Sequence, residues 1–396
     1  MSTERQESKL IRNLGFWDLM AIAVGQIIGA GIMSSTGVAI GMTGTGVVLA
    51  FLISPFLTII SIFPVAILSS AVPTTGGPYR YCSRLINKGF GMIYLLLHVT
   101  SYSVAVSQYA LSFGAYFSSI VPSVNQHLAA MVILTLFYAM NLTGAKSAAL
   151  LNKIISFALF GGLGLFVLFG LPKTDFSYVM NPANMFPNGP LMFVSTLALL
   201  SSATAGAQFI AELGGEAKDA GRTIPKVMVA STFGVGVFYV LIALVAAGVL
   251  PMDQVANQPL TLVAEATMPK VAMYLFVIGA ALGATSSTLN STLAWITNSL
   301  LCKLMVCVAL FALAAKHGDI LQRSTLKISA AASKVLAVVG IVILCVLSYS
   351  LFASLSGAVV IFLAALVAVS LVYVQVFTKN LNIENDLIVD YSAQKK

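Results

Sequence analysis

The chain has 396 residues, of which 59% are hydrophobic and only 9% are charged. Soluble globular domains carry about 25% charged residues, so this composition excludes an ordinary soluble protein and indicates an integral membrane protein. The formal net charge is +8, but the basic residues are spread over short loops, a pattern that sets orientation in a membrane and predicts no nucleic-acid partner.

Apolar runs of about 20 residues recur along the chain, and each is long enough to cross about 30 Å of hydrocarbon as a helix. Strands of a membrane barrel would instead be about 10 residues long with alternating polarity. The sequence therefore predicts an all-α membrane protein. In chain order the expected spans are 16–41, 44–71, 90–121, 126–145, 148–171, 190–213, 227–250, 270–298, 301–315, 333–353 and 356–377.

Basic residues fix the expected orientation of these spans. With the N-terminal tail (1–15) in the cytoplasm, eleven Lys and Arg residues fall inside and two fall outside through the first eight spans, as the positive-inside rule expects. If the short run 301–315 also crossed, the basic loop 316–334 would lie outside, against this rule. We therefore expect 301–315 not to be an ordinary span, and we place the C-terminal tail (378–396) inside.

Two of the expected spans contain residues that weaken a helix. Residues 24–33 read VGQIIGAGIM, and each glycine inside a helix costs about 1 kcal/mol relative to alanine. Residues 201–208 read SSATAGAQ, in the sixth span. Small residues also allow close helix packing, which is the alternative interpretation and the preferred one for Gly25. Paired interruptions in corresponding spans of two halves, however, indicate a transporter binding site near the bilayer midplane.

The partial charges at helix ends predict which ligand groups these interruptions would bind. A new helix N-terminus after Gly31 carries partial positive charge and suits a carboxylate. The carbonyl-rich end of the half-helix before Thr204 has the opposite sign and suits an ammonium group. Together the two ends predict a receptor for a zwitterion, an α-amino acid, which the glycines allow to approach the backbone closely.

Four motifs in order resemble the amino acid-polyamine-organocation (APC) superfamily of permeases. IIGAGIM (27–33) resembles the unwound first helix, and AVPTTGGPYRY (71–81) resembles the loop after the second span. GGEAKDAGRTIPK (214–226) resembles the block after the sixth span, with Ala220 where proline is usual. STLNSTLAW (287–295) is similar to the polar eighth span. The match covers residues 15–300.

The resemblance implies a LeuT-type inverted-repeat helical bundle in one transmembrane domain, residues 16–377. The first repeat would cover about 16–171 and the second about 190–353. The second repeat is incomplete near 298–333, which leaves about 10 to 11 spans where the family has 12. The substrate contacts that the resemblance implies are Ile28, Gly29, Ala30, Gly31, Ile32, Ala203, Thr204, Ala205, Gly206 and Ala207.

Two departures from the family pattern concern the site and its coupling. Ala207 stands where the family usually has an aromatic lid, and Gln208 stands where Glu is common. Leu159 stands where many members have a lysine that replaces a sodium ion, so proton coupling through that position is not supported.

Six residues are candidates for a gate or for coupling, and each has a structural alternative. Asp18 is either a helix cap or a proton carrier. Glu212 is either a proton relay or, with Glu216, part of an ion-pair gate near Lys218 and Arg222. The hydroxyls of span eight are either sodium ligands or bonded back to their own helix. Tyr102 either faces the substrate cavity or forms a hydrogen bond between helices. The complete set is Asp18, Tyr102, Gln208, Glu212, Ser286 and Ser287.

These features predict a secondary active transporter or exchanger of small, neutral α-amino acids that works by alternating access in the cell membrane. A proton or a counter-substrate would drive it. One alternative is a polyamine or cationic amino acid transporter, and another is a shortened, non-transporting membrane protein. An enzyme or a channel is the least favoured class of function, because we find no nucleophile–base cluster, phosphate loop or acidic ring. Neither a metal site nor a cofactor is predicted, since His98 and His127 stand alone and the four cysteines lack metal-site spacing.

Overall fold

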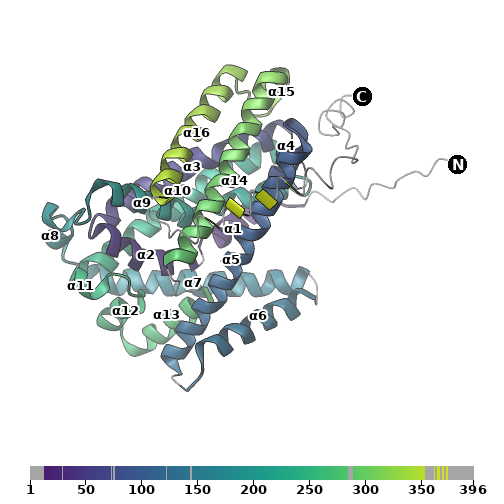
Figure 1. The fold of residues 1–396 in the computed structure, drawn as a ribbon. Helices are drawn as coiled ribbons and strands as arrows, with labels where there is room; N and C mark the ends of the chain where they lie inside the picture. The colour runs from purple at the N-terminus through teal and green to yellow at the C-terminus, as the bar shows by residue number, and fades with distance from the viewer. Residues whose placement is uncertain are drawn as a thin grey trace.

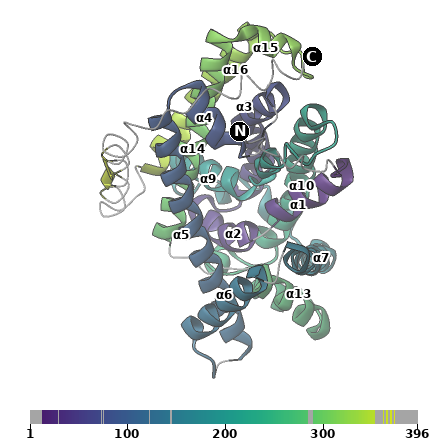
Figure 2. The same ribbon diagram turned by 90° about the vertical axis from the view of Figure 1, so that its right-hand side faces the viewer.

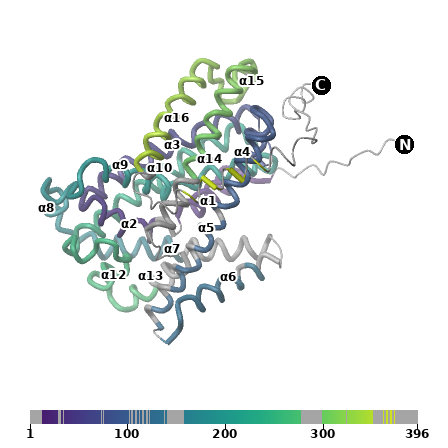
Figure 3. Tube along the Cα trace, in the orientation of Figure 1, coloured from purple at the N-terminus to yellow at the C-terminus, as the bar shows by residue number. Residues whose placement is uncertain are grey.

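The computed structural model describes residues 13–28, 30–72, 74, 76–121, 123–142, 145–283 and 289–352, with 361, 364, 365, 368, 369 and 372 (coloured in Figure 3). Within these residues the fold is a bundle of helices without a strand, apart from two isolated bridges, Leu14 with Ala217 and Gly44 with Met185. This confirms the predicted all-α class.

The described residues of the first half of the chain form seven helices (Figure 1). They are α1 (Phe16–Ile27), α2 (Ala30–Thr43), α3 (Val47–Ala71), α4 (Gly77–Leu85), α5 (Lys88–Ile120), α6 (Gln126–Leu142) and α7 (Ala145–Gly170).

The second half continues from α7 through short turns into longer helices. In order they are η1 (Leu171–Lys173), α8 (Phe176–Val179), η2 (Pro182–Asn184), α9 (Gly189–Ala203), η3 (Ala207–Glu212), α10 (Ala220–Gly248), α11 (Met252–Val255), α12 (Thr261–Thr267), α13 (Lys270–Gly283), α14 (Leu289–Lys316), α15 (Gly318–Arg323) and α16 (Ala330–Phe352).

The centre of the bundle is the pair α3 and α10, which pack along each other (Figure 1). A β-carbon on Gly236 of α10 would overlap the ring of Pro55 on α3, so glycine permits the close approach that joins membrane helices. Large apolar side chains such as Phe56, Phe233 and Val342 are exposed on the outside of these helices and of α16. Such a surface suits hydrocarbon and not water.

Four helices in the described part of the chain are long and apolar enough to cross a membrane. They are Val47–Ala71, Ala220–Gly248, Ser299–Lys316 and Ala330–Ser350. The predicted boundaries agree with most helices to within a few residues. Helix α10 begins at Ala220 and not near 227, with Pro225 inside the helix, and the sixth predicted span (190–213) continues past the end of α9 at Ala203.

One end of the bundle gathers the basic loops, and we call it the basic end. The amide of Leu326 donates to Ser70 Oγ at 3.2 Å, at the end of α3, and a β-carbon on Gly221 would lie 2.7 Å from Thr325 Oγ1. The loop 316–334 therefore lies beside the start of α10 and near α4 (Figure 2). Its lysines share this end with Arg80, Arg84, Lys218, Arg222 and Lys226.

The other end, which we call the loop end, carries residues 171–188 and 249–269. Lys173 Nζ donates to the carbonyls of Ala266 and Thr267, at 3.2 and 3.0 Å. Since α13 follows directly after Thr267, the chain from Lys270 to Lys316 runs from the loop end to the basic end. The predicted run 301–315 is the second part of α14, and the stretch Ser299–Lys316 is by itself long and apolar enough to cross a membrane. The expectation that 301–315 is not an ordinary span stays a prediction.

Candidate functional site

The first interruption lies between α1 and α2. Helix α1 ends at Ile27, and Ile28 has an extended backbone (φ −79°, ψ 98°) with its amide donating to Val24 O. The helix resumes at Ala30, so Ala30 and Gly31 form the first turn of α2 instead of preceding it as expected. First-turn N–H groups have no acceptor within their own helix and are suited to bind a carboxylate. Gly29 lies outside the described residues.

The second interruption lies between α9 and η3. Helix α9 ends at Ala203, and the chain turns through Thr204, Ala205 and Gly206 before the 3₁₀ turns of η3. The amide of Gly206 donates to Gln208 Oε1 at 2.9 Å. Gln208 therefore holds the interrupted backbone in place, a role that its position after the predicted lid site does not reveal.

The two interruptions contact each other directly. Gly206 has φ +143°, a conformation that side-chain-bearing residues rarely adopt. A β-carbon there would lie 2.6 Å from Gln26 O and 2.9 Å from Ile27 N. Only glycine allows the backbone of the sixth span to pass this close to the end of α1.

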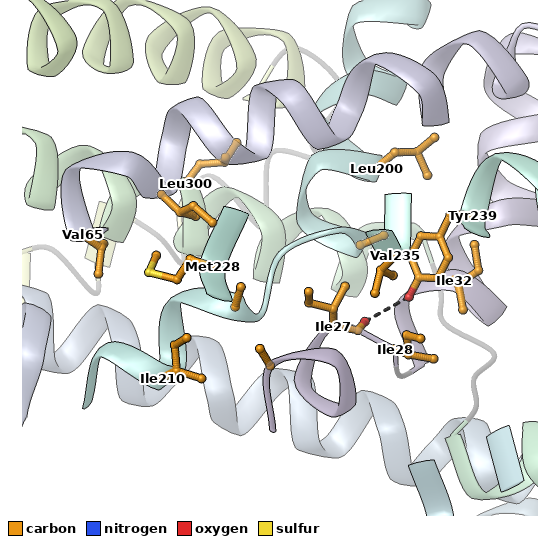
Figure 4. Packing of buried hydrophobic residues seen from close by; sticks show 14 of the residues in the cluster. Ile27, Ile28, Ile32, Val65, Leu200, Ile210, Met228, Val235, Tyr239 and Leu300 are labelled. Atoms are coloured by element: carbon orange, nitrogen blue, oxygen red, sulfur yellow. Dashed lines mark hydrogen bonds between the residues drawn. The ribbon is translucent and has the colours of Figure 1, made fainter. Parts of the chain in front are cut away.

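Two side chains that the sequence reasoning missed hold the broken ends in place. Tyr239 of α10 is fully buried, and its hydroxyl donates to Ile27 O at 3.0 Å (Figure 4). Thr58 of α3 is also fully buried and donates to Ser201 O at 2.8 Å, and its Oγ1 lies 2.7 Å from Thr204 Oγ1. Their only sequence signal is a lone hydroxyl in an apolar span, which more often bonds within its own helix.

These bonds decide which backbone groups remain for a ligand. The carbonyls of Leu200 and Ser201 accept bonds from within the protein. Among the described residues, the carbonyls of Ala203 to Ala205 accept no hydrogen bond. An unpaired carbonyl away from water is costly, so these groups are suited to an ammonium, as the helix-end argument expects.

Apolar side chains surround both interruptions. Ile28, Ile32 and Ala207 are buried, and so is Thr204. Figure 4 shows Ile27, Ile28 and Ile32 together with Ile210 of η3 and Met228 of α10. In such low-dielectric surroundings the partial charges of helix ends act strongly. No charged side chain occurs in the described residues of the two interruptions.

The gate and coupling candidates fall into three groups. Asp18 is exposed and accepts a bond from Gly15 N at 2.9 Å, which is the helix-cap alternative. Glu212 ends η3 beside Gly77 of α4. Residues 213–219 form turns and not a helix, so Glu212 and Glu216 are not helical neighbours, and within the described chain no ion pair joins either of them to Lys218 or Arg222.

The third group lies where the structure gives no side-chain detail. Ser286 and Ser287 lie outside the described residues, and Tyr102 lies on α5 without a described side chain. The predicted sodium and cavity roles of these residues stay predictions.

Two interrupted helices that pack against each other inside an apolar bundle define the fold class of a multi-pass membrane transporter. The chain belongs to the amino acid permease family, whose model matches residues 14–382. This confirms the resemblance read from the four motifs. Membership of a permease family also separates the chain from enzymes.

Three characterised relatives illustrate the family. The chain is 26% identical over 273 residues to the amino-acid permease RocE of Bacillus subtilis (strain 168), covering 65% of this chain and 58% of that relative. It is 25% identical over 306 residues to the branched-chain amino acid permease BcaP of the same organism, covering 71% and 64%. It is 24% identical over 300 residues to cationic amino acid transporter 1 of Arabidopsis thaliana, covering 71% and 50%. The chain therefore spans less than two thirds of these relatives' length.

A solved structure supports the fold. MHP1, a nucleobase-cation-symport-1 family transporter in a closed conformation with bromovinylhydantoin bound, superposes with a TM-score of 0.54. The identity is 15%, and the match covers 96% of this chain and 83% of MHP1. This likeness concerns the fold alone.

Proposed function

We propose that the chain is a secondary transporter of small, neutral α-amino acids. The observation that carries this proposal is the contact of the two interruptions at Gly206, because it brings the first turn of α2 and the open carbonyls of Ala203 to Ala205 into one apolar region. The first turn would bind the carboxylate, and the carbonyls would bind the ammonium.

Charge supports the choice of a neutral substrate. The described residues of the interruptions contain no acid that would pair with a second positive charge on a polyamine or an arginine, and no base for an acidic side chain. The relatives' names include both a branched-chain amino acid permease and a cationic amino acid transporter. A test must therefore determine the charge of the side chain of the transported amino acid.

The arrangement in the membrane is part of the proposal. The basic end would face the cytoplasm, as the positive-inside rule favours, with residues 16–171 and 190–353 as the two repeats of an alternating-access bundle in the cell membrane. A cysteine replacing Lys327 should then react with an impermeant maleimide only in inside-out vesicles. A cysteine replacing Lys173 should react only in right-side-out cells, and the opposite pattern would reverse the orientation.

Counterflow in proteoliposomes tests the transport function. Vesicles with the purified chain and loaded with unlabelled leucine should take up labelled leucine, whereas vesicles loaded with spermidine should not. Exchange of spermidine without leucine would support the polyamine alternative. No exchange of either, by a chain that elutes as a folded protein, would support the shortened, non-transporting alternative.

A further inference from the structure

Lys303 on α14 is a buried amine that the proposed transport site does not use. Its side chain is 6% exposed, and Nζ has no hydrogen-bond partner in the described structure. Among the described residues, Lys303 is the only Lys, Arg, Asp or Glu whose side chain is buried. An ammonium group without a counter-charge is strongly unfavourable in a membrane interior, so this position needs a physical explanation.

No carboxylate of the surrounding helices can neutralise Lys303. Helices α3, α4, α5, α9 and α16 pack against α14, and none of their sequences contains Asp or Glu. The sequence of α14 contains none either. On α15 the only acid is Asp319, which is exposed and belongs to the loop at the basic end.

The ionisable groups around Lys303 are thiols, phenols, a histidine and cations. Cys302 and Cys307 lie close enough to act on its charge, and Cys302 lies beside Cys82 of α4. Helix α5 contributes tyrosines and His98, and α16 contributes Cys345, Lys334 and Tyr349. Helices α3 and α9 contribute no ionisable group. Because buried thiols and phenols are poor anions, the described helices around α14 supply no stable counter-ion for the amine.

The position of Lys303 also links it to the interruptions. It lies 13 residues before the end of α14, which is about 20 Å from the basic end along the helix. Leu300 is one turn away on the same face and fully buried. Leu300 belongs to the same buried hydrophobic cluster as Val65 of α3, Ile27 and Ile210, all of which Figure 4 labels. Helix α3 packs against α14 and is hydrogen-bonded to the sixth span through Thr58, so it joins the second interruption to the helix that carries Lys303.

We propose that Lys303 is a proton-binding site of the transport cycle, which gives up its proton when the helices close around it and takes one up when they separate. The step balances as hydronium plus amine giving water plus ammonium, with the reverse on closing. The proton would thus be transported or exchanged in phase with the amino acid. This inference rests on the proposed transport function, which the same experiment measures separately.

The experiment uses the full chain in proteoliposomes and compares Lys303→Met with Lys316→Met. Lys316 is exposed at the end of the same helix, so it controls for the loss of a charge. Counterflow of leucine measures the exchange function without a gradient, and accumulation driven by an imposed pH gradient measures proton coupling. We expect Lys303→Met to retain counterflow while gradient-driven accumulation falls by about tenfold or more, and Lys316→Met to retain both.

The outcomes separate the inference from the function. Gradient-driven accumulation by Lys303→Met at the wild-type level would overturn the proton site while leaving transport intact. Dependence of wild-type transport on chloride, lost in Lys303→Met, would identify a small anion as the ligand and also overturn it. Absence of counterflow in the wild type would overturn both proposals. Lys303→Gln, which keeps a polar group without a titratable proton, should behave as Lys303→Met and guards against a packing defect of one variant.

Discussion

Replacing Gly206 by alanine tests the contact on which the candidate site is built. The new β-carbon would lie 2.6 Å from Gln26 O, whereas ordinary contact begins near 3.4 Å, so the two interruptions would have to move apart by roughly 0.8 Å along that line. The backbone conformation at φ +143° adds about 1–3 kcal/mol of strain for any residue with a side chain.

These magnitudes translate into a measurable loss of binding. Strain of this size corresponds to a factor of about 5–150 in an equilibrium constant, and a displacement near 1 Å costs about 100-fold where reacting groups must align. We therefore expect Gly206→Ala to weaken the binding of a labelled amino acid by about 10-fold to 100-fold. Saturation binding to the purified chain in detergent measures this, with elution volume as the check of folding.

Gly234→Ala is the matched control. Gly234 lies on α10, and a β-carbon there would meet no atom within 4 Å. Alanine in a helix is favoured by up to about 1 kcal/mol, so this variant should bind normally and be at least as stable. If folded Gly206→Ala bound within twofold of the wild type, the contact between the interruptions would not shape the site.

Four other perturbations have defined outcomes. Tyr239→Phe should lower the free energy of unfolding by about 0.5–1.5 kcal/mol through the lost bond, while Tyr274→Phe, at an exposed residue of α13, should not. Thr58→Val keeps the shape of the side chain but loses both hydroxyl contacts, so substrate affinity should fall while insertion into the membrane is unchanged. Normal affinity would show that Thr58 does not hold the second interruption in its binding geometry. The hydrogen bonds of Ser177 and of the following amides lower the pKa of Asp175, so its cap on α8 is present at neutral pH and is lost as pH falls through that lowered pKa. The protection of the amides of 176–179, taken relative to the intrinsic exchange rate at each pH, should therefore fall in acid in the wild type and already be low at neutral pH in Asp175→Ala. Gly31→Val should abolish counterflow without affecting insertion, and surviving transport would refute the carboxylate cradle.

The class of fold and the two interruptions could be predicted from sequence because both depend on local composition. Long apolar runs specify membrane helices, and glycine or small hydroxyl residues at their centres specify where those helices stop. The charge of the loops adds the prediction that 301–315 does not cross separately, which only a measurement of topology can test.

The side chains that hold the interruptions could not be predicted in the same way. Tyr239 reaches Ile27 across 212 positions, and Thr58 reaches Ser201 across 143. Such contacts depend on how α3 and α10 pack, and nothing in the neighbouring sequence specifies them. The environment of Lys303 is also tertiary, because the lack of an acid on the described helices beside it follows from which of them pack on α14.

The central claim is that the interruptions recognise both charged ends of an α-amino acid. Competition binding tests it directly: unlabelled leucine, leucine amide and 4-methylpentanoic acid are compared as competitors of labelled leucine on the purified chain. We predict that leucine competes and that both analogues, each lacking one charged group, compete at least about 10-fold more weakly, since each lost charge-assisted contact is worth about 1.5–3 kcal/mol. Equal competition by either analogue would contradict a site that binds both the carboxylate and the ammonium.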